Sequence, residues 1–215
     1  MILNGDNRLK ILVRLLLLMF AVVLSGCTFN HVSELRPSLD NSTVKEKLPF
    51  VVGVYYSPQF RDYEQARLKM VHRWIVPVGN ASVTLFDKAI PLLFDDVVPV
   101  EGIPTPAKRN DKVAAVIEPS IEEFDFELPL ALGDYTADVT YRITLRNSDG
   151  TGFASWTVEG HGRQGVGLGY LTHATPIGQV TDAAMQEAMR KFVDGFREVP
   201  EVRAWLRQSG LLRTE

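Results

Sequence analysis

Glycine-rich residues 160–165 are the first candidates for chemistry, because they match the pattern G-x-G-x-x-G. In dinucleotide-binding proteins such glycines let the backbone approach a pyrophosphate at the N-terminus of the following helix. Here residues 166–170 form a poor helix sequence with two more glycines, and the preceding strand belongs to a predicted hairpin. We therefore predict no nucleotide site. We expect residues 160–178 to form a surface loop, in which Tyr170 and Leu171 are candidate contacts for a partner protein.

An acidic cluster is the second candidate, because a pair of carboxylates can perform general acid–base catalysis. It consists of Glu118, Glu122, Glu123, Asp125 and Glu127. From residue 124 onward, however, carboxylates alternate with phenylalanines, as expected for a half-exposed strand. We therefore interpret the cluster as the solvated face of a strand.

Histidine and nucleophile patterns point to no further site. The four histidines, His31, His72, His161 and His173, lack the spacing of metal ligands, so we predict no metal and no other cofactor. The sequence has no G-x-S-x-G motif for a nucleophilic serine. We therefore expect the protein not to be an enzyme.

Alternating and helical hydrophobic patterns predict an α+β fold, with a mainly antiparallel sheet, helices packed on one face and a C-terminal amphipathic helix. Buried strands are predicted over residues 50–56 and 112–118, and half-exposed strands over residues 121–128, 135–145 and 153–158. A helix over residues 83–95 would be capped by Asn80 or Ser82 and kinked or shortened at Pro91. Thr181 is expected to cap the strongest amphipathic helix, and a short helix follows Pro200.

The N-terminal residues combine basic side chains with a short apolar run. Arg8, Lys10 and Arg14 precede or interrupt the apolar stretch, whose unbroken part covers residues 15–24. This pattern is typical of a secretory signal and is shorter than the roughly 20 apolar residues of a spanning helix. We therefore expect residues 1–26 to be a cleaved signal peptide, residues 27–47 a flexible tether, and residues 48–215 a single periplasmic domain.

Leu24, Ser25, Gly26 and Cys27 resemble the lipobox of bacterial lipoproteins, and Cys27 is the only cysteine of the chain. The resemblance implies cleavage before Cys27, S-diacylglycerol on its sulfur and an acyl group on its new amino group. It also implies sorting to the periplasmic face of the outer membrane, because Thr28 rather than Asp follows the cysteine; the inner membrane is the alternative. Incidental placement of Cys27 near another cleavage site is the other reading of these residues.

Composition limits the partners of the mature chain. Removal of the signal, with Asp6, Arg8, Lys10 and Arg14, changes the net charge from −3 to −5. A mildly acidic protein of this kind is a poor candidate for binding nucleic acid. We therefore expect a membrane contact through the lipid anchor and a protein partner in the envelope.

Residues 52–58, residues 183–189 and the Trp205-Leu206 pair resemble small Gram-negative envelope lipoproteins of the YajG and transport-auxiliary type. The resemblance concerns a lipidated tether, an α+β domain and a C-terminal helix. It implies a non-catalytic binding or scaffolding accessory of an envelope transport or assembly system. The alternative is a lipoprotein that binds a small molecule or a lipid between its sheet and its helices, in a cavity left open at Pro91.

Overall fold

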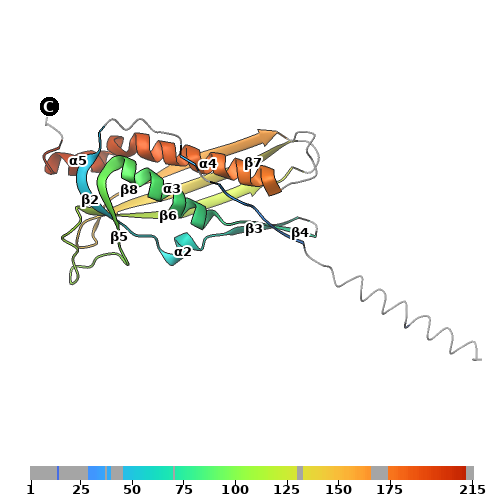
Figure 1. Cartoon of the computed structure of the whole chain (residues 1–215), viewed down its shortest axis with the longest axis horizontal. Helices are drawn as coiled ribbons and strands as arrows, with labels where there is room; N and C mark the ends of the chain where they lie inside the picture. The colour runs from blue at the N-terminus through green and yellow to red at the C-terminus, as the bar shows by residue number, and fades with distance from the viewer. Residues whose placement is uncertain are drawn as a thin grey trace, which may run out of the picture.

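The computed structural model describes residues 14, 29–36, 38–39, 46–69, 71–129, 133–165 and 174–211. The fold is a mixed α+β fold with two sheets, and most of the paired residues belong to antiparallel strand pairs. Figure 1 shows an elongated molecule, with the smaller sheet at one end and the C-terminal helix at the other. The predicted fold class is confirmed.

The larger sheet has the strand order β5-β2-β6-β7-β8. Its strands are β2 (Leu48–Val54), β5 (Phe94–Pro99), β6 (Ala115–Glu127), β7 (Asp134–Arg146) and β8 (Gly152–Gly165). β2 pairs in parallel with β5 and β6, whereas β6, β7 and β8 form an antiparallel meander. Val139, Tyr141, Ile143 and Leu145 of β7 are all buried, as the two-residue alternation predicts.

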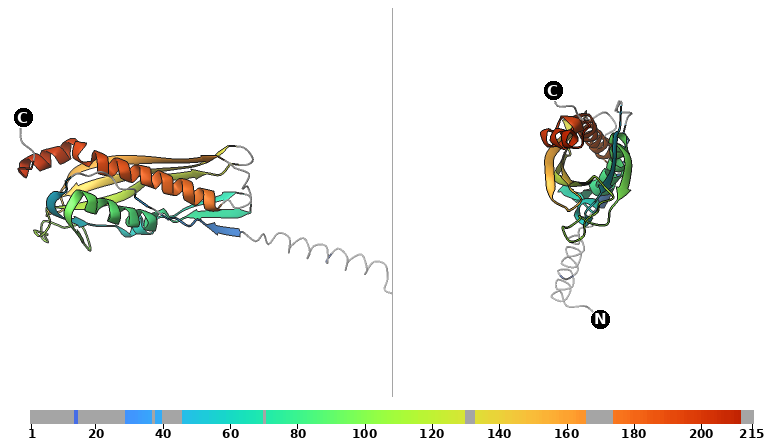
Figure 2. Two further views of the ribbon diagram at one scale, coloured as in Figure 1. Left: turned by 45° about the horizontal axis from the view of Figure 1, so that its top comes forward. Right: turned by 90° about the vertical axis from the view of Figure 1, so that its left-hand side faces the viewer.

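Two long helices lie on one face of this sheet, which curves around them (Figure 2). They are α3 (Val78–Leu93) and α4 (Ala174–Gly195); α4 packs across β7 and β8 and also contacts α3. The chain continues through a short 3-10 helix, η1 (Phe196–Glu198), into α5 (Pro200–Gln208). The core between helices and sheet is rich in aromatic rings, and Phe192 contacts both Phe86 and Phe196 edge to face.

The smaller sheet has the order β1-β4-β3. Its strands are β1 (Phe29–Val32), β3 (Gln65–Lys69) and β4 (His72–Val76), and the short helix α2 (Pro58–Arg61) lies between β2 and β3. β1 pairs in parallel with β4, and β3 pairs with β4 in antiparallel register.

The tether expected over residues 27–47 is therefore wrong where the structure describes it. Beyond β1, the backbone N–H of Arg36 donates to Asp182, and the side chain of Gln186 donates to Ser38. Leu35 and Leu39 pack against the core. The described part of this segment looks polar in sequence because, besides these hydrogen bonds, two apolar side chains spaced four residues apart pack it on the domain.

Both predicted helix starts are also corrected. α3 begins at Val78, and Ser82, expected as a cap, is a fully buried interior residue whose hydroxyl donates to the carbonyl of Val78. α4 begins seven residues before Thr181, because the buried side chains of Ile177 and Val180 extend its apolar stripe. Pro91 lies in the last turn of α3, which ends at Leu93.

Candidate functional site

The open face of the larger sheet carries the acidic cluster. Glu118 and Glu122 point to the side of β6 away from the helices, where two arginines of β7 meet them. The distance from Arg146 Nη2 to Glu118 Oε2 is 2.7 Å, and that from Arg142 Nε to Glu122 Oε1 is 2.6 Å. The prediction of a partly solvated strand face is confirmed, whereas the arginine partners were missed. The alternation of Arg142 and Arg146 with threonine on β7 was the signal that could have indicated them.

Further ion pairs continue this polar face toward the smaller sheet. His161 Nδ1 lies 2.6 Å from Asp138 Oδ1, and Arg163 pairs with Asp134. The His161 ring is more than half exposed, and its backbone N–H donates to Glu187 of α4. His161 therefore takes part in hydrogen bonds at the surface. Among the residues that the structure describes, no group of three His, Cys, Asp or Glu side chains is arranged to hold a metal ion.

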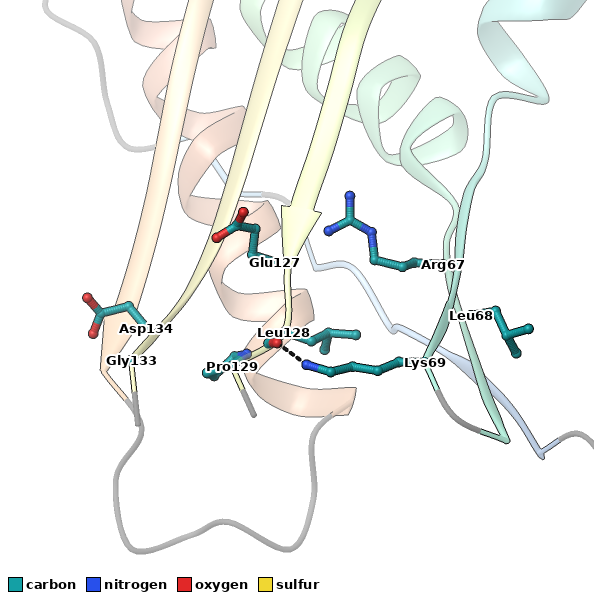
Figure 3. Close-up of a pocket in the computed structure, with 8 residues that line it drawn as sticks. All are labelled: Arg67, Leu68, Lys69, Glu127, Leu128, Pro129, Gly133 and Asp134. Atoms are coloured by element: carbon teal, nitrogen blue, oxygen red, sulfur yellow. Dashed lines mark hydrogen bonds between the residues drawn. The ribbon is translucent and has the colours of Figure 1, made fainter. Parts of the chain in front are cut away.

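A cleft of about 430 Å³ lies where this face meets the smaller sheet (Figure 3). Arg67 and Lys69 of β3 project toward the end of β6, whereas Leu68 projects away from it. Arg67 pairs with Asp125 and lies 5.2 Å from the centre of the Phe126 ring, and Lys69 donates to the carbonyl of Leu128. Both cations therefore hold the two sheets together, and Glu127 adds an exposed carboxylate to the cleft wall.

Two histidines separated by 41 residues meet on the smaller sheet. His31 Nε2 lies 2.8 Å from His72 Nδ1, and the His31 ring stacks on Trp74 with 4.3 Å between ring centres. Such a bond needs one imidazole as donor and the other as acceptor, so at least one ring is neutral when it forms. The sequence analysis placed His31 in the tether and did not predict this contact. The reason is that the parallel pairing of β1 with β4 joins segments far apart in the chain and leaves no pattern in neighbouring residues.

A second hollow, of about 420 Å³, lies beside Pro91 between β2, α3 and β5. Most of its lining is apolar, and its polar residues are Tyr56, Arg61 and Asp87. The Tyr56 hydroxyl donates to Asp87 at 2.8 Å, and Arg61 Nε donates to the Tyr56 carbonyl at 3.2 Å. Burial, followed by the bond to Asp87, raises the pKa of Tyr56 far above its ordinary value, so this side chain is a neutral donor at physiological pH.

The glycines of the G-x-G-x-x-G pattern serve helix packing. Gly160 and Gly162 lie within β8 and face α4, where a Cβ on either residue would overlap the carbonyl oxygen of Ala184 or Val180. The expected loop over residues 160–178 is therefore wrong at both ends, since β8 continues to Gly165 and α4 starts at Ala174. Small residues at these positions let the helix approach the strand backbone.

Several residues singled out in the sequence lie outside the described part of the chain. They are Cys27, the candidate lipid attachment site, and Tyr170, Leu171 and His173. The described residues nearest to them in sequence are Phe29, Gly165 and Ala174. Gly165 pairs with Asp134, which also lines the cleft.

No protein-family model matches the chain, and no curated protein matches its sequence. Comparison with solved structures does find similar proteins. A Xanthomonas campestris protein of the family DUF330 is 9% identical with a TM-score of 0.50, and the match covers 85% of this chain and 99% of that one. A minor lipoprotein from Acinetobacter baumannii is 8% identical with a TM-score of 0.45, covering 72% of this chain and 97% of that one.

A lipoprotein from Neisseria meningitidis is 12% identical with a TM-score of 0.30, and the match covers 54% of this chain and 84% of that one. At 9% identity, the similarity to the Xanthomonas campestris protein concerns the fold alone. Within the described residues, no helix combines the length and the apolar character that a membrane crossing requires.

Proposed function

We propose that the protein is a lipid-anchored, non-catalytic accessory of a cell-envelope transport or assembly system, held on the periplasmic face of the outer membrane. The observation that carries the proposal is the position of Cys27. This candidate lipid site follows a signal-like segment and stands two residues before β1, the first strand of the domain. The anchor would thus hold a folded domain close to the bilayer, where it meets other envelope proteins.

The open face of the larger sheet is the surface that we propose for the protein partner. Positively charged arginines and negatively charged carboxylates lie side by side on it, including Arg142 with Glu122 and Arg146 with Glu118. Polar surfaces with charges of both signs are typical of non-obligate interfaces, where electrostatic complementarity selects the partner. The apolar side of the same strands is already covered by α3 and α4, so this face is the one that the fold leaves open.

The anchor is tested with a Cys27→Ser variant of the full chain expressed in a Gram-negative host. We expect the unaltered protein to incorporate labelled palmitate and to fractionate with the outer membrane. The variant should incorporate no palmitate and leave the outer-membrane fraction. Absence of palmitate from the unaltered protein would refute the lipid anchor, and labelled unaltered protein in the inner-membrane fraction would refute only the proposed sorting.

The partner surface is tested by crosslinking in intact cells, followed by purification of the full-length protein in detergent. We expect a specific envelope protein to copurify and to be lost in Arg142→Glu, which places like charges beside Glu122. Arg207→Glu is the matched control, because Arg207 is an exposed arginine on α5. Equal recovery with both variants would exclude the open face as the binding surface.

Binding of a small or lipidic ligand is the second candidate function, favoured by the largely apolar hollow beside Pro91. Filling this hollow with Val83→Trp should abolish retention of a ligand, because Val83 forms part of its wall. Mass spectrometry of the natively purified protein would identify such a ligand. Absence of any retained lipid or metabolite in the unaltered protein would remove this candidate.

A further inference from the structure

The exposed large hydrophobic side chains are concentrated on the smaller sheet. Six such residues are exposed in the described part of the chain, and four of them belong to this sheet and its turn. Their exposed fractions are 56% for Phe29, 61% for Val32, 66% for Leu68 and 52% for Val71. A cluster of exposed apolar groups on one element marks an interaction site more often than isolated surface residues do.

Strand register places Leu68 and Val32 on one face of the smaller sheet, whereas Phe29, in the row of His72 and Lys69, lies on the other face at the same end. Leu68 stands in a row with Arg73 and Asn30, and Val32 stands in the next row on the same face, with Ile75 and Ala66. The backbone N–H of Phe29 donates to the carbonyl of Val71 at 2.9 Å, so these two residues join at the tip where β1 and β4 begin. We call this end of the smaller sheet, which carries Phe29, Val32, Leu68, Val71 and Arg73, the apolar tip.

The charge of the apolar tip also distinguishes it from the rest of the domain. Arg73 is exposed in the middle of one row, and neither row contains a carboxylate. The mature chain as a whole is acidic, so a carboxylate-free apolar face with a central arginine is a local exception. Apolar side chains with a cation beside them suit the interface of a bilayer, where phosphate groups lie above the acyl chains.

The short length of chain between the apolar tip and Cys27 indicates that a membrane contacts the tip. Two residues span at most about 7 Å between Cα atoms, so Phe29 stays within that distance of the candidate lipid site whatever path the chain takes. The polar interface on each side of a bilayer is itself about 5–7 Å thick. A lipid inserted from Cys27 therefore brings the apolar tip to the depth of the headgroups.

We propose that the apolar tip rests in the lipid headgroup layer of the membrane to which Cys27 is anchored. The inference rests on the lipid anchor proposed above and adds a fixed orientation to it. β6 runs away from the tip, from Asp125, which Arg67 contacts, to Ala115, which pairs with Val52, over roughly 30 Å. The end of the domain that carries α5 thus points into the periplasm (Figure 1).

The test uses the full-length lipidated protein in vesicles of phosphatidylethanolamine and phosphatidylglycerol, with a nitroxide label on one added cysteine. Val71→Cys places the label in the tip, and Val51→Cys is the matched control, because Val51 is an exposed valine on β2 at the far end of β6. Flotation of the vesicles measures anchoring. Collision of the label with a water-soluble nickel chelate measures its exposure.

We expect both proteins to float with the vesicles, and the label at position 71 to collide with the chelate several-fold less often than the label at position 51. Equal collision rates in floating protein would overturn the membrane contact of the tip and leave the lipid anchor intact. Failure of both proteins to float would overturn the anchor, and the tip contact with it. Circular dichroism of each variant confirms that the fold is retained.

Discussion

The Cα of Gly162 lies so close to the carbonyl oxygen of Val180 that a Cβ on this glycine would overlap that oxygen. Gly160, two residues earlier on the same face of β8, has the same relationship to Ala184, one turn further along α4. The two contacts place α4 directly on the strand backbone. Because neither glycine has a positive φ angle, the requirement is for space rather than for backbone conformation.

Gly162→Ala is therefore expected to lower the free energy of unfolding by about 3 kcal/mol or more, since the helix must move away from the strand to admit one methyl group. Urea unfolding followed by circular dichroism measures the change. Gly165→Ala is the control, because the nearest atom to its Cβ would be Asp134 Oδ1 at 3.5 Å, an ordinary contact. Similar losses for both variants would contradict the packing role of Gly162.

A buried hydrogen bond joins the other long helix to the sheet. Ser82 Oγ of α3 lies 2.8 Å from Tyr141 Oη of β7, and the same hydroxyl donates to the carbonyl of Val78. Ser82→Ala should cost about 1–3 kcal/mol, because it leaves the buried hydroxyl of Tyr141 without this partner. Tyr141→Phe should cost only about 1 kcal/mol, since Ser82 keeps its bond to Val78.

The double variant Ser82→Ala with Tyr141→Phe tests this interpretation. Removing both hydroxyls leaves no unpaired polar atom from this bond, so its cost should be smaller than the sum of the two single costs. Thr84→Ala is the control on the exposed side of α3, where Thr84 Oγ1 donates to Asn80. Additive costs in the double variant would show that the two hydroxyls act independently.

The segment that follows β1 lies against α4 at another glycine. A Cβ on Gly178 would lie 2.6 Å from the carbonyl oxygen of Glu34, so Gly178→Ala should push this segment off the helix. We expect faster cleavage after Glu34 by a glutamate-specific protease, with little change in global stability, because alanine also favours the helix by about 1 kcal/mol. Gly195→Ala is the control, since its Cβ would meet nothing within 4 Å. Unchanged cleavage would contradict docking of this segment.

Asp182 should make stability fall as pH rises. Burial raises the pKa of its carboxyl above the usual 3.8, and the hydrogen bond from the Arg36 N–H offsets this only in part. The folded protein then holds this proton more tightly than the unfolded chain, so stability is lost as pH rises through the interval between the two pKa values. Asp182→Asn should remove this slope, because an amide does not titrate in this range.

Asp149→Asn provides a control of opposite sign. A hydrogen bond from the backbone N–H of Thr151 lowers the pKa of Asp149, so this group contributes stability above pH 3.8 that is lost as pH falls through the folded-state value. Chemical unfolding between pH 3 and pH 7 should show the two slopes changing in opposite directions. Parallel profiles for the two variants would show that neither carboxyl behaves as described.

Local patterns were sufficient for the meander and for the apolar faces of its strands. Residues 135–145 alternate strictly, and a pleated strand with one buried face has only one register that satisfies such an alternation. The acidic residues of β6 were placed on the solvated side for the same reason. The lipobox at Cys27 and the contacts expected of Tyr170 and Leu171 remain predictions, because they lie outside the described residues.

The sequence by itself thus determined the fold class, the buried face of the meander and the candidate anchor, because each depends on residue type and on neighbours along the chain. Only the tertiary structure decided what Gly160, Gly162, His31 and Arg67 do. Each of them acts on a partner at least 18 residues away in sequence, such as Val180 for Gly162 or His72 for His31. Glycine in a strand fits a loop, a phosphate site and a helix contact equally well until the helix that covers it has been placed.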